Sequence, residues 1–199
     1  MKTVIFRRKA ITFLGITAVL LAAAAFTAGC KTNADDDTGG NNGGTTPPAE
    51  YTKVDFGTNG EGLRDYLAKA SADGINYIEV TGLSASDLVM DATYISPLCK
   101  VLKDNKTKKV ALKFGSDLTG VTDMSYCFLD GASQIGCRNL VQVSGIPAGV
   151  QTMMGVFYGC KNLVEAPEIP NSVTNMDRCF ADCQKLVKAP KIPESVTNL

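Results

Sequence analysis

The feature that most constrains the fold is a repeat of 23 residues in the carboxyl-terminal part of the chain. Leu140, Leu163 and Leu186 lie at this interval. Four further sets of apolar residues share it: Ile146, Ile169 and Ile192; Val150, Val173 and Val196; Met153, Met176 and Leu199; Phe157 and Phe180. Apolar residues at constant phases over such a period predict stacked coils, because each coil must cover the apolar face of its neighbour.

A further unit lies upstream and carries an insertion. The segment VTDMSYCF, Val121 to Phe128, aligns with VTNMDRCF, Val173 to Phe180. Phe128 precedes Cys137 by nine residues, whereas the corresponding interval in the later units is three. Six additional residues therefore stand between Leu129 and Gly136, and we expect them to form a loop.

Six cysteines follow Cys30, and most of them occupy fixed phases of the repeat. We predict that they are buried thiols, which fill a core as small apolar side chains. The spacing of Cys179 and Cys183 fits neither a CxxC redox turn nor a zinc knuckle. The six are Cys99, Cys127, Cys137, Cys160, Cys179 and Cys183.

Disulfide bonds are the alternative for these cysteines. An even count in an exported chain is typical of a disulfide framework, and six cysteines allow 15 pairings. Same-phase side chains on neighbouring coils would stand about 4.8 Å apart, which exceeds the roughly 3.8 Å between Cβ atoms that a disulfide prefers. Buried thiols are thus favoured along the stack, and other pairings stay open.

The chain offers little for catalysis or metal binding. It contains no histidine, which excludes catalytic triads and histidine metal sites. Asp130, Asp177 and Asp182 are candidate catalytic carboxylates, but no cleft is indicated, and we predict that they lie on a solvated face. Met153 and Met176 are expected to fill the core. We predict no enzyme, no cofactor and no metal site.

A row of short polar residues precedes the methionine phase of each unit. Short polar side chains mimic backbone in turns, so we expect this row to form a ladder of hydrogen bonds to loop backbone. Its members are Asp123, Thr152, Asn175 and Asn198.

The amino terminus, residues 1–29, has the three parts of a signal peptide. Basic residues precede an apolar run from Ile11 to Phe26, and small residues follow it. The run is too short for a comfortable transmembrane helix, so the chain is expected to be exported. Thr27 to Cys30 resembles the relaxed lipobox of bacterial lipoproteins, with Thr27 in place of the usual leucine. That resemblance implies a lipid on Cys30 and attachment to a membrane.

Residues 30–50 combine this cysteine with a polar segment that predicts a flexible linker, since it carries no large apolar side chain. Asp35 to Asp37 lack the alternation and final glutamate of a calcium loop. Residues 51–109 predict an α/β cap: a helix over 60–71, a strand over 76–83, a helix over 96–106 and a strand over 109–115. A separate ligand-binding module is less favoured, because no glycine-rich phosphate loop follows either strand.

Residues 110–199 resemble the BspA-like leucine-rich repeats of bacterial surface antigens. The shared pattern is C..L....IP.SVTNM..CF..C, which in that family reads approximately C..L....IP..V..I...AF..C. The resemblance implies an α/β or mainly β leucine-rich-repeat-like solenoid of 23-residue units. This chain departs from the pattern in Pro167 and Pro190, which predict short or irregular strands. Its last unit stops at Leu199 before the phenylalanine, so apolar side chains there are expected to be partly uncovered, either in a fragment or at an edge that pairs with another chain.

Charge and resemblance together set the functional expectation. Formal net charge is zero, but residues 1–29 hold four basic and no acidic residues, which leaves 20 − 4 = 16 basic against 20 acidic residues. A mildly acidic body argues against nucleic acid as a partner. The resemblance implies a lipid-anchored binding or adhesion module of the bacterial cell envelope, at the outer membrane or cell surface, with a protein or host-matrix partner. An exported thiol- or carboxylate-dependent enzyme and a purely structural envelope lipoprotein are the alternatives.

Overall fold

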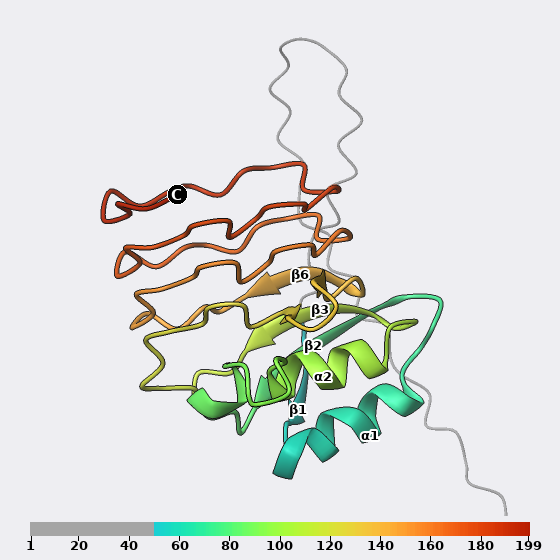
Figure 1. The fold of residues 1–199 in the computed structure, drawn as a ribbon. Helices are drawn as coiled ribbons and strands as arrows, with labels where there is room; N and C mark the ends of the chain where they lie inside the picture. The colour runs from blue at the N-terminus through green and yellow to red at the C-terminus, as the bar shows by residue number, and fades with distance from the viewer. Residues whose placement is uncertain (1–49) are drawn as a thin grey trace, which may run out of the picture. The chain divides into compact units, whose positions relative to one another are not determined.

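The computed structural model describes residues 50–199 (Figure 1). The predictions for the signal peptide over 1–29, the lipid on Cys30 and the aspartates Asp35 to Asp37 fall outside these residues.

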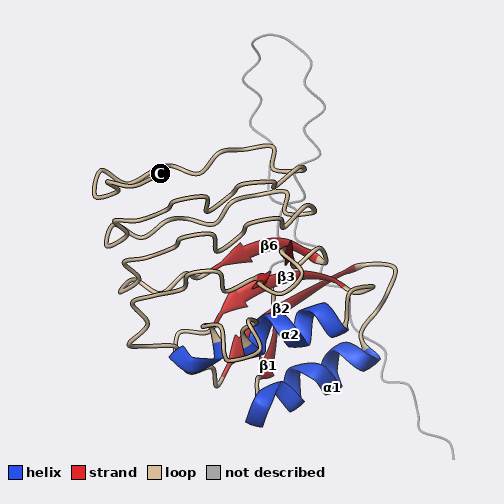
Figure 2. Cartoon of the chain, viewed as in Figure 1, coloured by secondary structure: helices blue, strands red, loops and turns tan. Residues whose placement is uncertain are grey.

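A parallel sheet of four strands forms the first half of the fold (Figure 2). The strands are β1 (Thr52–Asp55), β2 (Ile75–Thr81), β3 (Lys109–Phe114) and β6 (Leu140–Ser144), in the order β1-β2-β3-β6. Leu112 is in register with Ile78 on one side and Val143 on the other, and all three are buried. The strand β1 was not expected, because only Val54 of its four residues is buried.

Two helices cover one face of this sheet. They are α1 (Glu61–Lys69) and α2 (Pro97–Asp104), and the single turns η1 (Thr58–Gly60) and η2 (Ala85–Asp87) precede them. Ser96 caps α2 by accepting a hydrogen bond of 3.0 Å from the backbone N–H of Cys99, and Pro97 opens the helix. The two helices and two strands predicted over residues 60–115 are confirmed, each to within a few residues at its ends.

After β6 the chain runs in successive passes that lie side by side, drawn from orange to red in Figure 1. Parallel bridges join Gln142 to Glu165 and Glu165 to Lys188, each at an interval of 23 residues. Pro167 and Pro190 each follow a bridging residue by two positions, and neither can donate to a ladder. Pairing is therefore limited to isolated bridges, as the prolines predicted.

A column of phenylalanine rings runs through the interior of these passes. The ring centroids of Phe128 and Phe157 lie 5.5 Å apart, and those of Phe157 and Phe180 lie 5.2 Å apart with planes only 12° from parallel. Phe114 on β3 continues the column at 6.3 Å from Phe128. Met153 and Met176 are buried beside it, which confirms the prediction for both methionines.

The row of short polar residues predicted from the sequence is also present in the structure. Parallel bridges connect Asp123 to Thr152, Thr152 to Asn175 and Asn175 to Asn198. An oxygen of the Asp123 side chain accepts a hydrogen bond of 2.7 Å from the backbone two residues later, and Asn175 accepts one of 3.0 Å in the same way. The predicted bonds from side chain to loop backbone are confirmed for Asp123 and Asn175.

The six inserted residues form a small antiparallel hairpin. Its strands are β4 (Leu129–Asp130) and β5 (Ile135–Gly136). The backbone of Gly136 lies directly against the next pass, since a Cβ atom there would stand 2.2 Å from the carbonyl oxygen of Tyr158. The hairpin thus packs directly against the unit that follows it, and only glycine fits at this contact.

The last pass is the most exposed part of the repeat. The side chains of Val187 and Leu199 are 82% and 73% exposed, and Ile192 is 39% exposed. Leu186 and Val196 are partly buried against the core. Partial exposure of Leu186, Ile192 and Val196 was expected from the sequence.

We predict that Phe157→Ala lowers the free energy of unfolding by about 3–5 kcal/mol, because it opens a cavity between two stacked rings. Val187→Ala is the matched control and should change it by less than about 0.5 kcal/mol, because that side chain is exposed. Urea unfolding followed by circular dichroism measures both. Equal effects of the two substitutions would contradict a packed column.

Candidate functional site

A groove lined by three tyrosines lies between the hairpin and the two passes that follow it. It encloses about 400 Å³. One wall comes from the segment before α2 and from the hairpin, and the other comes from the repeat units. The lining residues are Met90, Tyr94, Tyr126, Leu129, Gly131, Gln134, Tyr158 and Arg178.

The repeat itself positions two of these side chains. Tyr126, Gly155 and Arg178 occupy one phase, two residues before the phenylalanine of each unit. All three have left-handed backbone, with φ of 58°, 58° and 52°. Glycine adopts this conformation freely, whereas for other residues the strained backbone costs roughly 1–3 kcal/mol. Two of the three units nevertheless carry a tyrosine or an arginine at this strained position.

Gly155 makes room for the ring of Tyr126. A Cβ atom at Gly155 would lie 2.4 Å from Cε1 of that ring, so the tyrosine ring lies directly against the backbone of the next pass. Tyr158 stands at the phase occupied by Leu129 and Ala181 in the neighbouring units. The aromatic character of the groove thus comes from substitutions within a regular repeat.

Backbone strain is concentrated around the groove. Among residues 50–199, six residues other than glycine have a left-handed backbone, and four of them line this groove. Such strain persists only where the surroundings hold it, and it gathers at functional sites. The four are Tyr94, Tyr126, Gln134 and Arg178.

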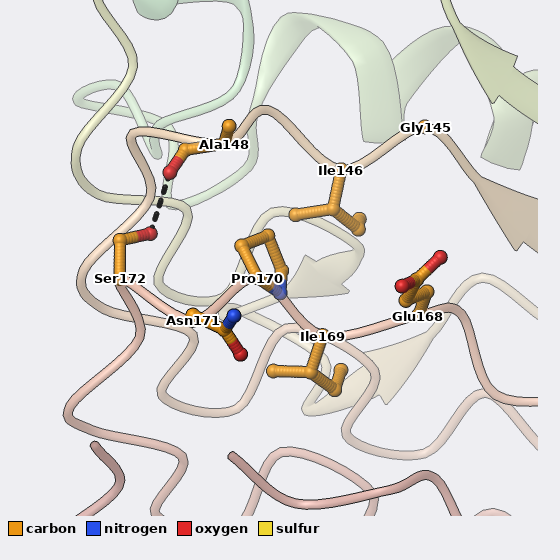
Figure 3. A pocket seen from close by; sticks show the side chains of 8 residues that line it. All are labelled: Gly145, Ile146, Ala148, Glu168, Ile169, Pro170, Asn171 and Ser172. Atoms are coloured by element: carbon orange, nitrogen blue, oxygen red, sulfur yellow. Dashed lines mark hydrogen bonds between the residues drawn. The ribbon is translucent and has the colours of Figure 1, made fainter. Parts of the chain in front are cut away.

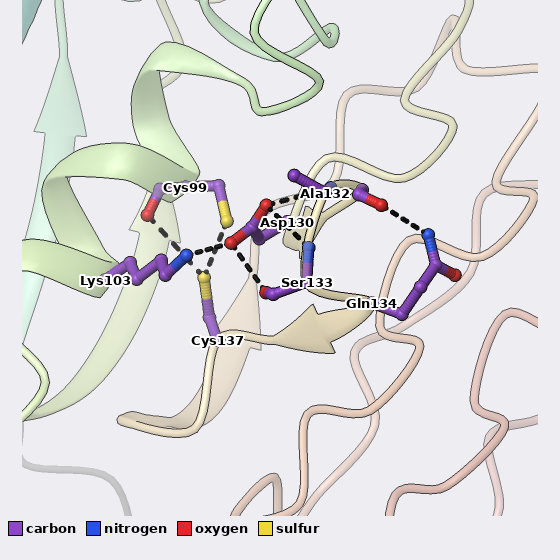
Figure 4. A network of polar contacts seen from close by, with 8 residues as sticks. Cys99, Lys103, Asp130, Ala132, Ser133, Gln134 and Cys137 are labelled. Carbon is purple, nitrogen blue, oxygen red and sulfur yellow. Dashed lines mark hydrogen bonds and ion pairs between the residues drawn. The ribbon is translucent and has the colours of Figure 1, made fainter.

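Asp130 holds the hairpin wall of the groove in place (Figure 4). Its carboxylate accepts hydrogen bonds from the backbone of Ala132 at 3.1 Å and from the hydroxyl of Ser133 at 2.6 Å, and it pairs with Lys103 of α2. The prediction that Asp130 lies on a solvated face is wrong, because the residue is only 5% exposed. The insertion turns this carboxylate inward, where its hydrogen bonds and its ion pair join the hairpin to α2.

Two further contacts continue this network towards the groove. The amide of Gln134 donates to the carbonyl of Gly131 at 2.6 Å, and the backbone N–H of Gly131 donates to the carbonyl of Tyr94 at 2.8 Å. Tyr94 itself is 67% exposed. The groove therefore presents one exposed and two half-buried tyrosines, and hydrogen bonds hold the backbone of its hairpin wall.

The other two candidate carboxylates do not join Asp130. Asp182 is exposed, and hydrogen bonds from Gln184 and from Lys161 lower the pKa of its carboxyl group. Asp177 is half-buried and its backbone N–H donates to Asn175. In the described part of the chain, no group of three or more His, Cys, Asp or Glu residues could hold a metal ion.

A second groove of about 410 Å³ lies on the side of the Ile-Pro segments (Figure 3). Ile146 and Ile169 line it at equivalent phases, and the hydroxyl of Ser172 lies 2.7 Å from the carbonyl oxygen of Ala148. One unit later, Ser195 makes a similar hydroxyl-to-carbonyl contact with Val173, at 2.7 Å. The hydroxyl of Ser172 thus serves a contact between units, and the groove has no aromatic side chain, so it is the weaker candidate.

The cysteines are buried, as predicted, except that Cys183 is only partly buried. Burial raises the pKa of Cys127 and Cys160 well above the ordinary thiol value. It raises the pKa of Cys179 to about 12 and that of Cys183 to about 11. Because the thiolate is the reactive form, these four side chains are poor nucleophiles.

The tyrosine groove was not predicted from the sequence. A signal for it was present, since Tyr126 and Arg178 stand at the phase that Gly155 occupies. The apolar phases alone do not reveal positions at which one unit differs from its neighbours.

We predict that the protein loses stability as pH rises from 8 to 10. In the unfolded chain the thiols ionise near pH 8.5, whereas Cys160 and Cys179 stay protonated in the folded state. Each thiol then lowers the free energy of unfolding by up to about 1.4 kcal/mol per pH unit. Cys179→Ala should show a smaller loss over the same range in urea unfolding. An identical pH dependence in that variant would contradict the shifted pKa.

Comparison with known proteins identifies no relative. No family model, no curated protein and no solved structure matches the chain. Within residues 50–199, none of the helices has the length and apolarity needed to cross a bilayer. Function must therefore be argued from the chemistry of the groove and from the sequence pattern.

Proposed function

We propose that this chain is a lipid-anchored protein of the bacterial cell envelope whose repeat unit binds a protein partner through the tyrosine groove. The repeat is proposed to be a leucine-rich-repeat-like solenoid, with residues 51–109 as its α/β cap. Support for the anchor comes from the signal peptide pattern, Cys30 and the polar linker. The groove with its strained aromatic lining is the observation that carries the binding role.

The lining residues suit protein recognition. Tyrosine offers a large, rigid contact area with few rotatable bonds, and its hydroxyl supplies a polar end. Tyrosine and arginine are enriched among the residues that dominate binding energy at interfaces. Tyr126 and Arg178 stand in one row on a backbone that the repeat holds, so little ordering would be required on binding.

Catalysis has less support. The alternative of a thiol-dependent enzyme requires a lowered thiol pKa, and the four pKa values described above are raised. The carboxylate alternative requires two free acids in one cleft, whereas Asp130 is committed to Lys103 and Ser133. A purely structural envelope role would leave the groove residues without effect on any interaction, which the following test addresses.

We predict that Tyr126→Ala or Tyr158→Ala weakens binding to immobilised extracellular-matrix proteins by about 30-fold, the effect of losing one dominant contact. Biolayer interferometry with the full-length chain measures this. Tyr51→Ala is the matched control, because Tyr51 packs edge-on against Tyr77 and neither residue lines the groove. Wild-type protein that binds no protein of the panel, or binding that survives both groove substitutions, would contradict the proposal.

A glycine variant separates groove shape from side-chain loss. Gly155→Ala keeps every tyrosine but forces a Cβ atom against the ring of Tyr126, so it should also weaken binding. Gly149→Ala is its control, since the nearest atom to a Cβ there is a carbonyl oxygen at 3.4 Å.

We predict that Cys30→Ala releases the protein from membranes into the soluble fraction, because the lipid attached to this cysteine is the proposed anchor. Metabolic labelling with a radioactive fatty acid and membrane fractionation measure the change. Cys183→Ala, which removes a partly buried cysteine of the repeat, should leave the protein labelled and membrane-bound. Unlabelled wild-type protein would contradict the anchor.

A further inference from the structure

The sulfur atoms of Cys99 and Cys137 lie 3.1 Å apart (Figure 4). Cys99 stands on α2, and Cys137 follows β5 directly, 38 residues later in the chain. Both side chains are buried, at 1% and 3% exposure. Two elements that are distant in sequence thus bring their thiols together inside the core.

This separation is shorter than an ordinary packing contact. Carbon atoms in a core pack at about 3.5–4.0 Å, and sulfur is larger than carbon. A disulfide bond is about 2.05 Å long, so the two sulfur atoms need to approach by only about 1 Å. Movement of this size lies within the reach of side-chain rotation.

We propose that Cys99 and Cys137 form a disulfide bond in the mature protein and that this bond pins α2 to the hairpin carrying Gly131 and Gln134 of the tyrosine groove. The objection to disulfides between same-phase cysteines of the stack does not apply here. Cys99 lies outside the repeat and reaches Cys137 from the helix rather than from a neighbouring coil.

The reaction is a thiol–disulfide exchange. The oxidant is a disulfide compound, either a small molecule or a thiol oxidoreductase. One protein thiolate attacks it and releases one thiol, and the second protein thiolate then displaces the other. The protein gains one S–S bond, and two electrons and two protons pass to the oxidant, which becomes two thiols. Oxidation in the cell requires export to an oxidising compartment and so rests on the proposed function.

Burial affects when the bond forms. The contact with Cys99 and the loss of water raise the pKa of the Cys137 thiol. Cys137 therefore carries little thiolate in the folded protein, and its exchange is expected to be fast during folding and slow afterwards. Because both side chains are buried, a bond formed during folding is shielded from external reductants.

Neighbouring contacts join α2 to the hairpin and to the segment that follows it without the disulfide. Lys103 pairs with Asp130, and the side-chain amide of Asn139 donates to the carbonyl of Leu102 at 2.9 Å. Variants that lack one cysteine are thus expected to fold, which keeps the proposal testable by substitution.

Peptide mapping of the full-length chain tests the pairing. The protein is purified from an exporting host, its free thiols are alkylated in acid and denaturant, and it is digested with trypsin without reduction. We expect residues 70–100, which contain Cys99, to be linked to residues 114–138. The second peptide contains both Cys127 and Cys137. Cys127→Ser should therefore retain the link, whereas Cys137→Ser should abolish it.

A parallel sample separates failure of the pairing from failure of export. Chain produced with reduced thiols is refolded with oxidised glutathione and mapped in the same way. A link in this sample alone would uphold the pairing and contradict oxidation in the cell, and with it export. Fully alkylated Cys99 and Cys137 in both samples would overturn the proposal.

A stability measurement gives an independent readout. Closing a loop of 38 residues should raise the melting temperature by about 10 °C for a domain of this size. Unfolding and refolding in reductant before heating is expected to remove that increase in the wild type, because the buried bond is accessible only in the unfolded chain, and to have no effect on Cys137→Ser. Equal melting temperatures for wild type with and without reductant would contradict a structural bond.

Discussion

Register between successive passes is the constraint on which the rest of this structure depends. At an interval of 23 residues each side chain meets its own counterpart, so that Phe157 stacks on Phe180 at 5.2 Å. The bridges from Gln142 to Glu165 and from Glu165 to Lys188 keep the same interval on the backbone. A shift of one residue in one pass would separate the rings and the bridges together.

The candidate site arises where single units depart from this regularity. The inserted hairpin adds a wall, Gly136 lets that wall lie against the next pass, and Asp130 ties it to α2. A tyrosine and an arginine occupy a phase that glycine would fill with less strain. Residues that the repeat units have in common build the core, whereas residues at which the units differ line the groove.

The sequence predicts the core residues more completely than the residues of the candidate site. Periodicity predicted the burial of Phe157, Met153 and Met176, and helix capping predicted α2 from Ser96. These predictions depend on patterns repeated along the chain. The strand β1 carries only one buried residue, and the burial of Asp130 depends on how an unrepeated insertion folds back. Neither leaves a periodic signal.

The left-handed row through Tyr126, Gly155 and Arg178 has a wider consequence. Its backbone shape is dictated by the turn of each pass, whereas its side chains at Tyr126 and Arg178 face outward into the groove. The side chains at Tyr126 and Arg178 can consequently be exchanged for others while the interior keeps its arrangement, whereas Gly155 must stay small to leave room for the neighbouring ring. A change of preferred binding target at these two positions therefore needs no change of the fold.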